Sequence, residues 1–364
     1  IFLLFAMTIF EIIDYFNCFF TIKNFIRTTS KKGLLWIFAI LAFILSAIID
    51  NLTATIVLIT ILQKVIRDRN TRIWFAGLII IAANAGGAWS PIGDVTTTML
   101  WIGDKVTTGQ LIMYLLIPSI VCVVVPVFIA TFLPAFQGDI KKDENEEEGS
   151  LHPRGASMLY LGLSAIVFVP VFKTVTHLPP YVGMMLSLAI VATFAEIFSN
   201  AKINISSIDQ ESDAHASHSP VHSSLSKIEL PSILFFLGIL MAVAALESLG
   251  YLFSFADSLN TAIPNTDIVV VLLGAGSAVI DNVPLVAASM GMFSEPTDHP
   301  LWHFIAFSAG TGGSMLIIGS AAGVVAMGME KIDFVWYLKK ISWLALIGFL
   351  AGSVVFVLMR DLVF

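Results

Sequence analysis

A series of uncharged apolar runs, each of about 20 residues, constrains this chain more than any other feature. Of the 364 residues, 57% are hydrophobic and only 12% are charged, and the mean hydropathy is +0.90. A soluble domain of this size does not need so much apolar surface, whereas each run is long enough to cross a bilayer as a helix. The sequence therefore predicts an all-α polytopic membrane protein.

One stretch occurs twice inside these apolar runs. Residues 46–53 read Ser-Ala-Ile-Ile-Asp-Asn-Leu-Thr, and residues 277–284 read Ser-Ala-Val-Ile-Asp-Asn-Val-Pro. Asp and Asn are poor helix formers, and an ionisable residue inside a bilayer is expensive and marks a functional site. The repetition predicts two related halves built around paired sites, Asp50-Asn51 and Asp281-Asn282.

The basic residues predict how the first copy enters the membrane. Lys and Arg cluster before it and after it, at 23–32 and 64–72. Cytoplasmic loops carry the excess of Lys and Arg, so both ends of the segment should lie on the cytoplasmic side. Each arm of about 15 residues extends roughly 22 Å, which passes the midplane without crossing. Residues 34–63 are therefore predicted to form a re-entrant helical hairpin with Asp50-Asn51 at its tip.

The second copy has the opposite charge pattern. Its flanks, 264–267 and 294–300, contain no Lys or Arg, so residues 266–293 should form a hairpin that enters from the outer side. This arrangement leaves only three of the 19 Lys and Arg outside, namely Lys105, Lys173 and Arg360. Two halves of opposite orientation make an inverted-topology repeat.

Each hairpin is followed by a crossing helix that contains helix-breaking residues. The interruptions are residues 84–94 within 73–101 and residues 311–320 within 301–327, and both are rich in glycine. Glycine and proline weaken helices, and broken helices at membrane depth are tolerated only inside protein or along a cavity. We therefore expect two broken transmembrane helices. Their alignment places Gly86-Gly87 on Gly312-Gly313, Gly93 on Gly319 and Asp94 on Ser320.

Hairpins and broken helices in inverted repeats are typical of secondary transporters, and hard cations prefer oxygen ligands. The predicted cation- and proton-binding residues are the polar side chains of the two tips and the two breaks: Asp50, Asn51, Thr53, Asn84, Ser90, Asp94, Thr96, Thr97, Ser277, Asp281, Asn282, Thr311, Ser314 and Ser320. Because Asp94 aligns with a serine and Thr53 with Pro284, the first half should hold the stronger site, with Na⁺ at Asp94 and Asp50.

A carboxylate removed from water also binds a proton more readily. One site that holds either a proton or a metal cation produces antiport by competition. The alternative is that some of these acids are structural helix caps, since Asp and Asn cap helices well. Glu11 and Asp14 share one helix face and are possible pathway acids, or they pair with Lys or Arg near the cytoplasmic face.

The chain divides by composition into five segments. Residues 1–33 are a scaffold helix and basic loop, and 34–136 are the first transport repeat. Residues 137–155 are an acidic cytoplasmic linker, 156–263 are scaffold helices with a Ser/His-rich linker at 200–229, and 264–364 are the second transport repeat. The linker histidines His215, His218 and His222 could suit a metal, but a disordered linker is the preferred interpretation. Because the chain begins inside an apolar run, we expect it to be N-terminally incomplete.

Four stretches carry a family resemblance: residues 6–14, 45–55, 86–97 and 319–324. At these residues the chain resembles the NhaD-type sodium/proton antiporters of the ion transporter superfamily. The resemblance implies that cytoplasmic Na⁺ or Li⁺ is exchanged for external protons by alternating access. It also implies a homodimer in the inner (plasma) membrane, with a scaffold part, a mobile transport part and helices that precede Ile1. Neither a cofactor, an enzymatic reaction nor a nucleic-acid partner is expected.

Two other classes of function compete with this interpretation. Relatives in the superfamily carry dicarboxylates or other anions with sodium, and their tips read Ser-Asn-Thr. Here both tips read Asp-Asn, and a fixed negative charge would repel a dianion. A membrane-embedded enzyme is the second alternative, but the helical segments contain neither an HExxH nor a GxSxG motif.

Overall fold

The computed structural model describes residues 2–16, 28–140, 154–176, 178–199, 219–227 and 265–362, with scattered positions between 234 and 263. These residues form helices, and the one β-bridge among them joins Ser30 to Asp139. Six of the described helices are long and apolar enough to cross a membrane: α3, α5, α7, α8, α9 and α18. The prediction of an all-helical, multi-pass membrane protein is confirmed.

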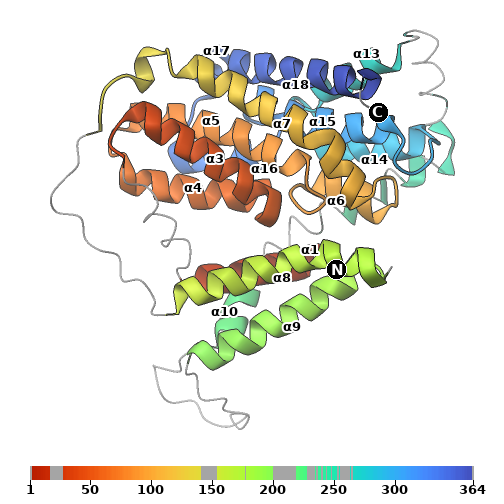
Figure 1. The fold of residues 1–364 in the computed structure, drawn as a ribbon, viewed down its shortest axis with the longest axis horizontal. Helices are drawn as coiled ribbons and strands as arrows, with labels where there is room; N and C mark the ends of the chain where they lie inside the picture. The colour runs from red at the N-terminus through yellow and green to blue at the C-terminus, as the bar shows by residue number, and fades with distance from the viewer. Residues whose placement is uncertain are drawn as a thin grey trace. The chain divides into compact units, whose positions relative to one another are not determined.

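The chain divides into two compact units (Figure 1). Unit 1 contains α1 (Phe2–Tyr15), α8 (Gly155–Thr176), α9 (Pro180–Ser199) and the short α10 (Pro220–Ser226). In unit 1, α8 and α9 pack against each other and both contact α1. Unit 2 contains α3 to α7 and α13 to α18, and includes both copies of the Asp-Asn stretch.

The helices of the first copy are interrupted at the predicted points. The helices α3 (Lys31–Ile49) and α4 (Asn51–Val65) are separated by Asp50, whose φ of 81° lies in the left-handed region. A residue with this backbone conformation cannot continue a right-handed helix. After α5 (Arg69–Ala88), residues 89–94 form the first break, and α6 (Val95–Ile102) and α7 (Thr108–Ala130) follow.

The second copy has the same order of helices. Residues 277–281 separate α13 (Thr266–Gly276) from α14 (Asn282–Met292). After α15 (Pro300–Gly312), residues 313–320 form the second break, which includes the 3₁₀ turn η2 (Gly313–Met315). The remaining helices are α16 (Ala321–Glu330), α17 (Phe334–Lys340) and α18 (Ser342–Leu362). Both helix breaks are therefore confirmed, while the depth and direction of the hairpins stay a prediction.

The structure differs from the sequence expectations at three helices. The first arm, α3, has 19 residues because the helix begins at Lys31, whose amide donates to the carbonyl of Gly138. The seven-residue α17 was not expected. The linker at 200–229 was predicted to be disordered, yet it contains α10. Ser219 caps this helix by accepting from the amide of His222, and Pro220 occupies its first turn. Of the linker histidines, His215 and His218 lie outside the described residues.

Two sets of helix ends meet within unit 2. At one end, the α4–α5 link contacts the end of α16, as described below. At the other end, Thr107 before α7 donates twice to the carboxylate of Asp298, at 2.7 and 2.8 Å, and Asp298 donates its amide to the carbonyl of Lys105. The α6–α7 link therefore meets the α14–α15 link. Separately, Arg360 of α18 pairs with Asp267 at the start of α13.

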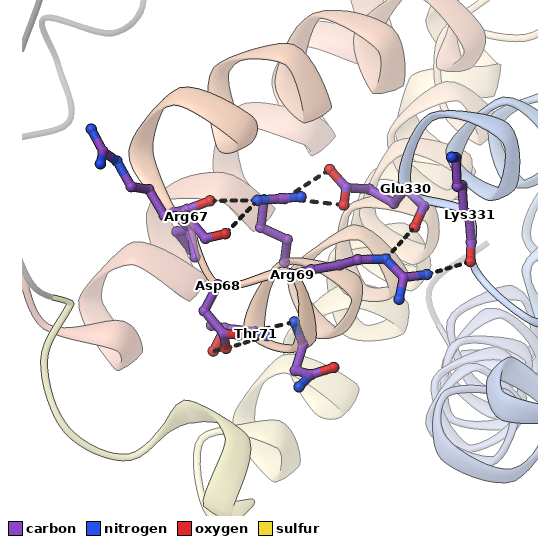
Figure 2. Close-up of polar contacts among 9 residues, drawn as sticks. Arg67, Asp68, Arg69, Thr71, Glu330 and Lys331 are labelled. Atoms are coloured by element: carbon purple, nitrogen blue, oxygen red, sulfur yellow. Dashed lines mark hydrogen bonds and ion pairs between the residues drawn. The ribbon is translucent and has the colours of Figure 1, made fainter.

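A buried ion pair fastens α5 to α16 (Figure 2). The Nε of Arg72 lies 3.0 Å from both carboxylate oxygens of Glu330, which is 2% exposed. Arg69 donates to the carbonyls of Glu330 and Lys331, at 3.2 and 2.6 Å. Asp68 caps α5 through the hydroxyl and amide of Thr71, and these hydrogen bonds lower the pKa of Asp68. The first turn of α5 is thus held to the last turn of α16.

We expect Glu330→Gln to lower the free energy of unfolding by about 2–3 kcal/mol, because it removes the carboxylate from the partly buried guanidinium of Arg72, which keeps only the carbonyls of Ile66 and Arg67 as acceptors. Thermal unfolding of the purified protein in detergent measures the effect. Glu295→Gln is the matched control, because Glu295 is half-exposed and its contact with His299 is 3.8 Å long. Equal destabilisation by the two variants would contradict a structural role for the Arg72–Glu330 pair.

Candidate cation site

The two Asp-Asn stretches pack against their helix breaks through matching contacts. Ser46 donates its hydroxyl to the carbonyl of Ala83 in α5, at 2.5 Å. Its repeat mate, Ser277, donates to the carbonyl of Ala309 in α15, at 3.1 Å. All of these groups are buried, so each serine ties the segment before an Asp-Asn pair to the helix before a break.

Close backbone contacts explain the aligned glycines. A Cβ on Gly86 would lie 2.3 Å from the carbonyl oxygen of Phe43, and one on Gly312 would lie 2.0 Å from that of Gly274. Real Cβ atoms do not approach a backbone oxygen so closely, so both positions require glycine. Within each break the pattern repeats: a Cβ on Gly87 would meet the oxygen of Gly93, and one on Gly313 would meet the oxygen of Gly319, at 2.4 and 2.5 Å.

Asp94 lies at the end of the first break, where α6 begins, and is only 3% exposed. Its Oδ2 accepts from the amide Nδ2 of Asn282, at 3.1 Å. Its Oδ1 accepts from the backbone amide of Thr96 at 3.5 Å, and its carbonyl accepts from the hydroxyl of Thr97 at 2.9 Å. The carboxylate predicted to dominate the first half therefore binds the Asp-Asn segment of the second half.

Asn84, near the end of α5, is the centre of a second buried network. Its Oδ1 accepts from Nδ2 of Asn51 at 3.1 Å, and its Nδ2 donates to Oγ of Ser320 at 2.9 Å. Ser320 in turn accepts from the amide of Gly323, at the start of α16. This network also joins the two halves, and it contains no charged group.

The two acids of the repeated stretch, Asp50 and Asp281, differ from Asp94 of the first break. Asp50 is half-buried and caps α4, because it accepts from the amide and the hydroxyl of Thr53 at 2.8 and 3.0 Å. These contacts fit the alternative that Asp50 is a structural helix cap. Asp281 precedes α14 and is also half-buried, but its side chain accepts no capping hydrogen bond. Asp94 caps α6 as well, so capping by itself does not separate a structural acid from a binding one.

The remaining predicted residues lie in the breaks or in unit 1. Ser90 accepts from the amide of Ile92 at 3.4 Å, and Thr311 donates to the carbonyl of Phe307. Ser314 donates to the carbonyl of Thr311, and its own carbonyl accepts from the hydroxyl of Tyr337. These three side chains complete local turns in the structure. Glu11 and Asp14 belong to α1 of unit 1 and stay predicted pathway acids.

Sequence reasoning missed Gly310. A Cβ at this position would lie 3.2 Å from Cβ of Ala88 and 3.6 Å from Oδ2 of Asp94, so glycine allows α15 to pack closely against the first break beside the carboxylate. The alignment of the two halves, which pairs Gly310 with Asn84, was the sequence signal that could have identified this residue. The hydroxyl of Thr55 is buried without a hydrogen-bond partner in the described part of the chain, and the hydroxyl of Thr96 is buried beside Asp94. Among the described residues no three His, Cys, Asp or Glu side chains cluster.

Comparison with known proteins places this chain in a family. Residues 1–303 match the family model CitMHS, described as "Citrate transporter". Over 98% of its length the chain is 40% identical to "Sodium/proton antiporter 2" of Arabidopsis thaliana and covers 84% of that protein. Over 93% of its length it is 34% identical to "Na(+)/H(+) antiporter NhaD" of Vibrio parahaemolyticus, again covering 84%. The chain belongs to the NhaD-type sodium/proton antiporter family.

The similarity to "Sodium/proton antiporter 1" of Arabidopsis thaliana is higher, at 43% identity over the whole chain. The chain spans 62% of the length of that relative. Within this NhaD-type chain, the polar centre of unit 2 is built from both copies of the repeated stretch. Asp94 with Asn282 and Asn84 with Asn51 and Ser320 are its two buried hydrogen-bonded groups.

Proposed function

We propose that this chain forms the transporting core of a secondary antiporter, which exchanges cytoplasmic Na⁺ or Li⁺ for external protons. The observation that carries the proposal is the Asp94 carboxylate, which is buried at a helix break and bonded to Asn282. Buried ionisable groups within membrane segments mark ion or proton pathways. The relatives named sodium/proton antiporters support the choice of ions.

In this mechanism one carboxylate holds one ion at a time. Deprotonated Asp94 attracts a dehydrated cation, and neighbouring oxygens complete its coordination. A proton that binds Asp94 removes the negative charge, and the cation leaves. If both forms can move between the two membrane faces, competition at Asp94 couples the two fluxes. Asp50 is the second candidate. It is only half-buried, and its carboxylate already accepts two capping hydrogen bonds from Thr53.

We propose that both Asp-Asn segments are re-entrant hairpins and that they enter from opposite faces. The contacts at the helix ends support this arrangement. The α4–α5 link shares one end with the last turn of α16, through Arg72 and Glu330. The α14–α15 link shares the other end with the α6–α7 link, through Asp298 and Thr107. Each hairpin would then return to the side from which it came.

Cysteine accessibility tests this topology. In a background without Cys18 and Cys122, we expect Asn70→Cys and Ser294→Cys to react with a membrane-impermeant maleimide from opposite sides of the membrane. Both positions are exposed: Asn70 lies in the first turn of α5, after the first proposed hairpin, and Ser294 directly follows the second. Sealed right-side-out and inside-out vesicles distinguish the two sides. Labelling of both cysteines from the same side would rule out an inverted repeat.

We further propose that residues 34–136 and 264–364 move as a transport part against a scaffold of residues 1–33 and 156–263, in a homodimer in an inner (plasma) membrane. Rigid-body alternating access needs such a division. The two compact units support it in part, because residues 26–33 and 234–263 of the proposed scaffold belong to unit 2. An engineered cross-link between the two parts should abolish exchange. Full activity of the cross-linked protein would argue against this movement.

Dequenching of a pH-sensitive dye in reconstituted vesicles tests the ions themselves. We expect Na⁺ or Li⁺ to release protons from acid-loaded vesicles, whereas K⁺ and citrate should not. The citrate arm is included because the matching family model is described as a citrate transporter. Sodium-dependent uptake of citrate without proton exchange would instead support the anion-symport alternative.

A further inference from the structure

The short helix α17 lies where a crossing helix begins. It ends at Lys340, and α18 starts at Ser342 and is long enough to cross a membrane. Because a crossing helix begins close to a membrane surface, α17 must lie near one of the two surfaces. In the topology proposed above, this surface is the cytoplasmic one.

One face of α17 is apolar and exposed. Its side chains are Phe334, Val335 and Leu338, which are 36%, 49% and 45% exposed. Positions one and four residues apart lie on neighbouring parts of a helix surface, so these three form a single face. Tyr337 is the one buried residue of this helix. An amphipathic helix that lies in the plane of a bilayer buries such a face at the boundary between headgroups and acyl chains.

Positive charge surrounds this apolar face. The exposed Lys and Arg residues at this end of unit 2 are Arg67, Arg69, Lys331, Lys339 and Lys340. The exposed acids Asp68 and Asp333 cap α5 and α17 by accepting backbone amides. In the described part of the chain, no carboxylate forms an ion pair with Lys339 or Lys340. Both lysines, in the last turn of α17, are therefore available to a phosphate group.

The opposite face of α17 contacts the second helix break. The hydroxyl of Tyr337 donates to the carbonyl of Ser314 in η2, at 2.8 Å. The ring of Trp336 also packs against Trp74 of α5, with ring centroids 5.3 Å apart. A displacement of α17 would therefore pull on the break or break the Tyr337 hydrogen bond. The position of this surface helix and the conformation of the break are coupled.

We propose that α17 is an interfacial helix that binds an anionic lipid of the cytoplasmic leaflet. Its apolar face enters the boundary of the acyl chains, and Lys339 and Lys340 bind the headgroup phosphate. Bound lipid fixes α17 and, through Tyr337, holds the second break in place. The lipid contact is independent of the proposed function, whereas its effect on exchange rests on that function.

Fluorescence quenching in vesicles tests the lipid contact. Val335→Cys, in a chain without Cys18 and Cys122, is labelled with bimane and reconstituted into phosphatidylcholine. The vesicles contain a small fraction of nitroxide-labelled phosphatidylglycerol or the same fraction of nitroxide-labelled phosphatidylcholine. Both probes should quench the label, and the anionic probe should be favoured roughly fivefold or more. A basic residue near an anionic surface contributes about 1 kcal/mol, which corresponds to that factor.

A matched pair of lysine variants makes this result specific. Lys339→Gln combined with Lys340→Gln should make the two probes quench equally. Lys31→Gln combined with Lys32→Gln alters another adjacent pair, at the start of α3, and should keep the preference.

Several results would overturn the lipid contact: no quenching by either probe, equal quenching in the chain with all its lysines, or a preference that survives in Lys339→Gln/Lys340→Gln. Loss of the preference when inorganic phosphate is added at constant ionic strength would show binding of free phosphate in place of a lipid, and would overturn it too.

The dependence of exchange on lipid tests the role of Tyr337. Replacing part of the phosphatidylcholine by phosphatidylglycerol should raise sodium-dependent proton release severalfold in the wild type. Tyr337→Phe keeps the ring, so it should retain the lipid preference and lose this activation. Equal activation of both proteins would overturn coupling through the hydroxyl. A wild-type chain that prefers the anionic probe but releases no protons in either lipid would contradict the antiporter proposal and leave the lipid contact standing.

Discussion

Asp94→Asn should abolish sodium-dependent proton release from vesicles while the protein still folds and inserts. The substitution keeps the shape of the side chain and one oxygen, and it removes the charge and the titrating group. Because sodium and the proton are proposed to compete for this carboxylate, both halves of the exchange should be lost. We expect a loss of roughly a hundredfold or more in kcat/KM for sodium.

Two further variants make this result interpretable. Asp94→Glu should retain part of the exchange with a raised apparent KM, because the charge survives but its position shifts by one methylene. Asp143→Asn, in the acidic linker, is the control that removes a carboxylate from outside both repeated stretches and both breaks, and it should change little. Near-normal exchange by Asp94→Asn would show that the coupling site lies elsewhere, with Asp50 as the next candidate.

Gly312→Ala should prevent unit 2 from reaching its native packing. The added Cβ would lie 2.0 Å from the carbonyl oxygen of Gly274 and 2.8 Å from the hydroxyl of Ser277. The nearest atom belongs to the backbone and cannot rotate away, so the segment before Asp281 must separate from the second break. Overpacking of flexible cores costs about 1–3 kcal/mol, and this contact should exceed that range. Folded yield in size-exclusion chromatography and thermal unfolding measure the effect.

Gly328→Ala is the matched control, since Gly328 lies in α16 and a Cβ there has no neighbour within 4 Å. Alanine forms helices better than glycine by about 1 kcal/mol, so this variant should be as stable as the wild type or slightly more so. A Gly312→Ala protein with wild-type yield and unfolding temperature would show that the Gly274–Gly312 approach is not required.

The sequence predicted which residues interrupt the helices, because that information is local. Asp50, the glycines of both breaks and Pro91 all disfavour a continuous helix wherever they stand, and the apolar runs on either side define where helices resume. The internal repeat also predicted which positions of the two breaks correspond, since Gly86-Gly87 and Gly312-Gly313 align without any structural information. The short helices α10 and α17 escaped prediction because their apolar patterns are too brief to stand out from a linker.

The polar side chains of the site were also apparent from the sequence, because few groups of that kind occur inside apolar runs. Their hydrogen-bond partners were not apparent from the sequence. The alignment of the two halves predicted that the first half holds the stronger site, at Asp94 and Asp50, whereas in the structure the Asp94 carboxylate accepts from Asn282 of the second half. Hydrogen bonds between residues so far apart in the chain depend on how the two breaks pack against each other.

By itself, then, the sequence determined the membrane class, the positions of the helix breaks and the acids inside them, since bilayer solvation and helix propensity act on each segment separately. Only the tertiary structure decided that Asp50 caps the helix that follows it, that Asp94 accepts from Asn282, and that Asn84 bonds both Asn51 and Ser320. Those contacts arise where two similar segments pack across each other.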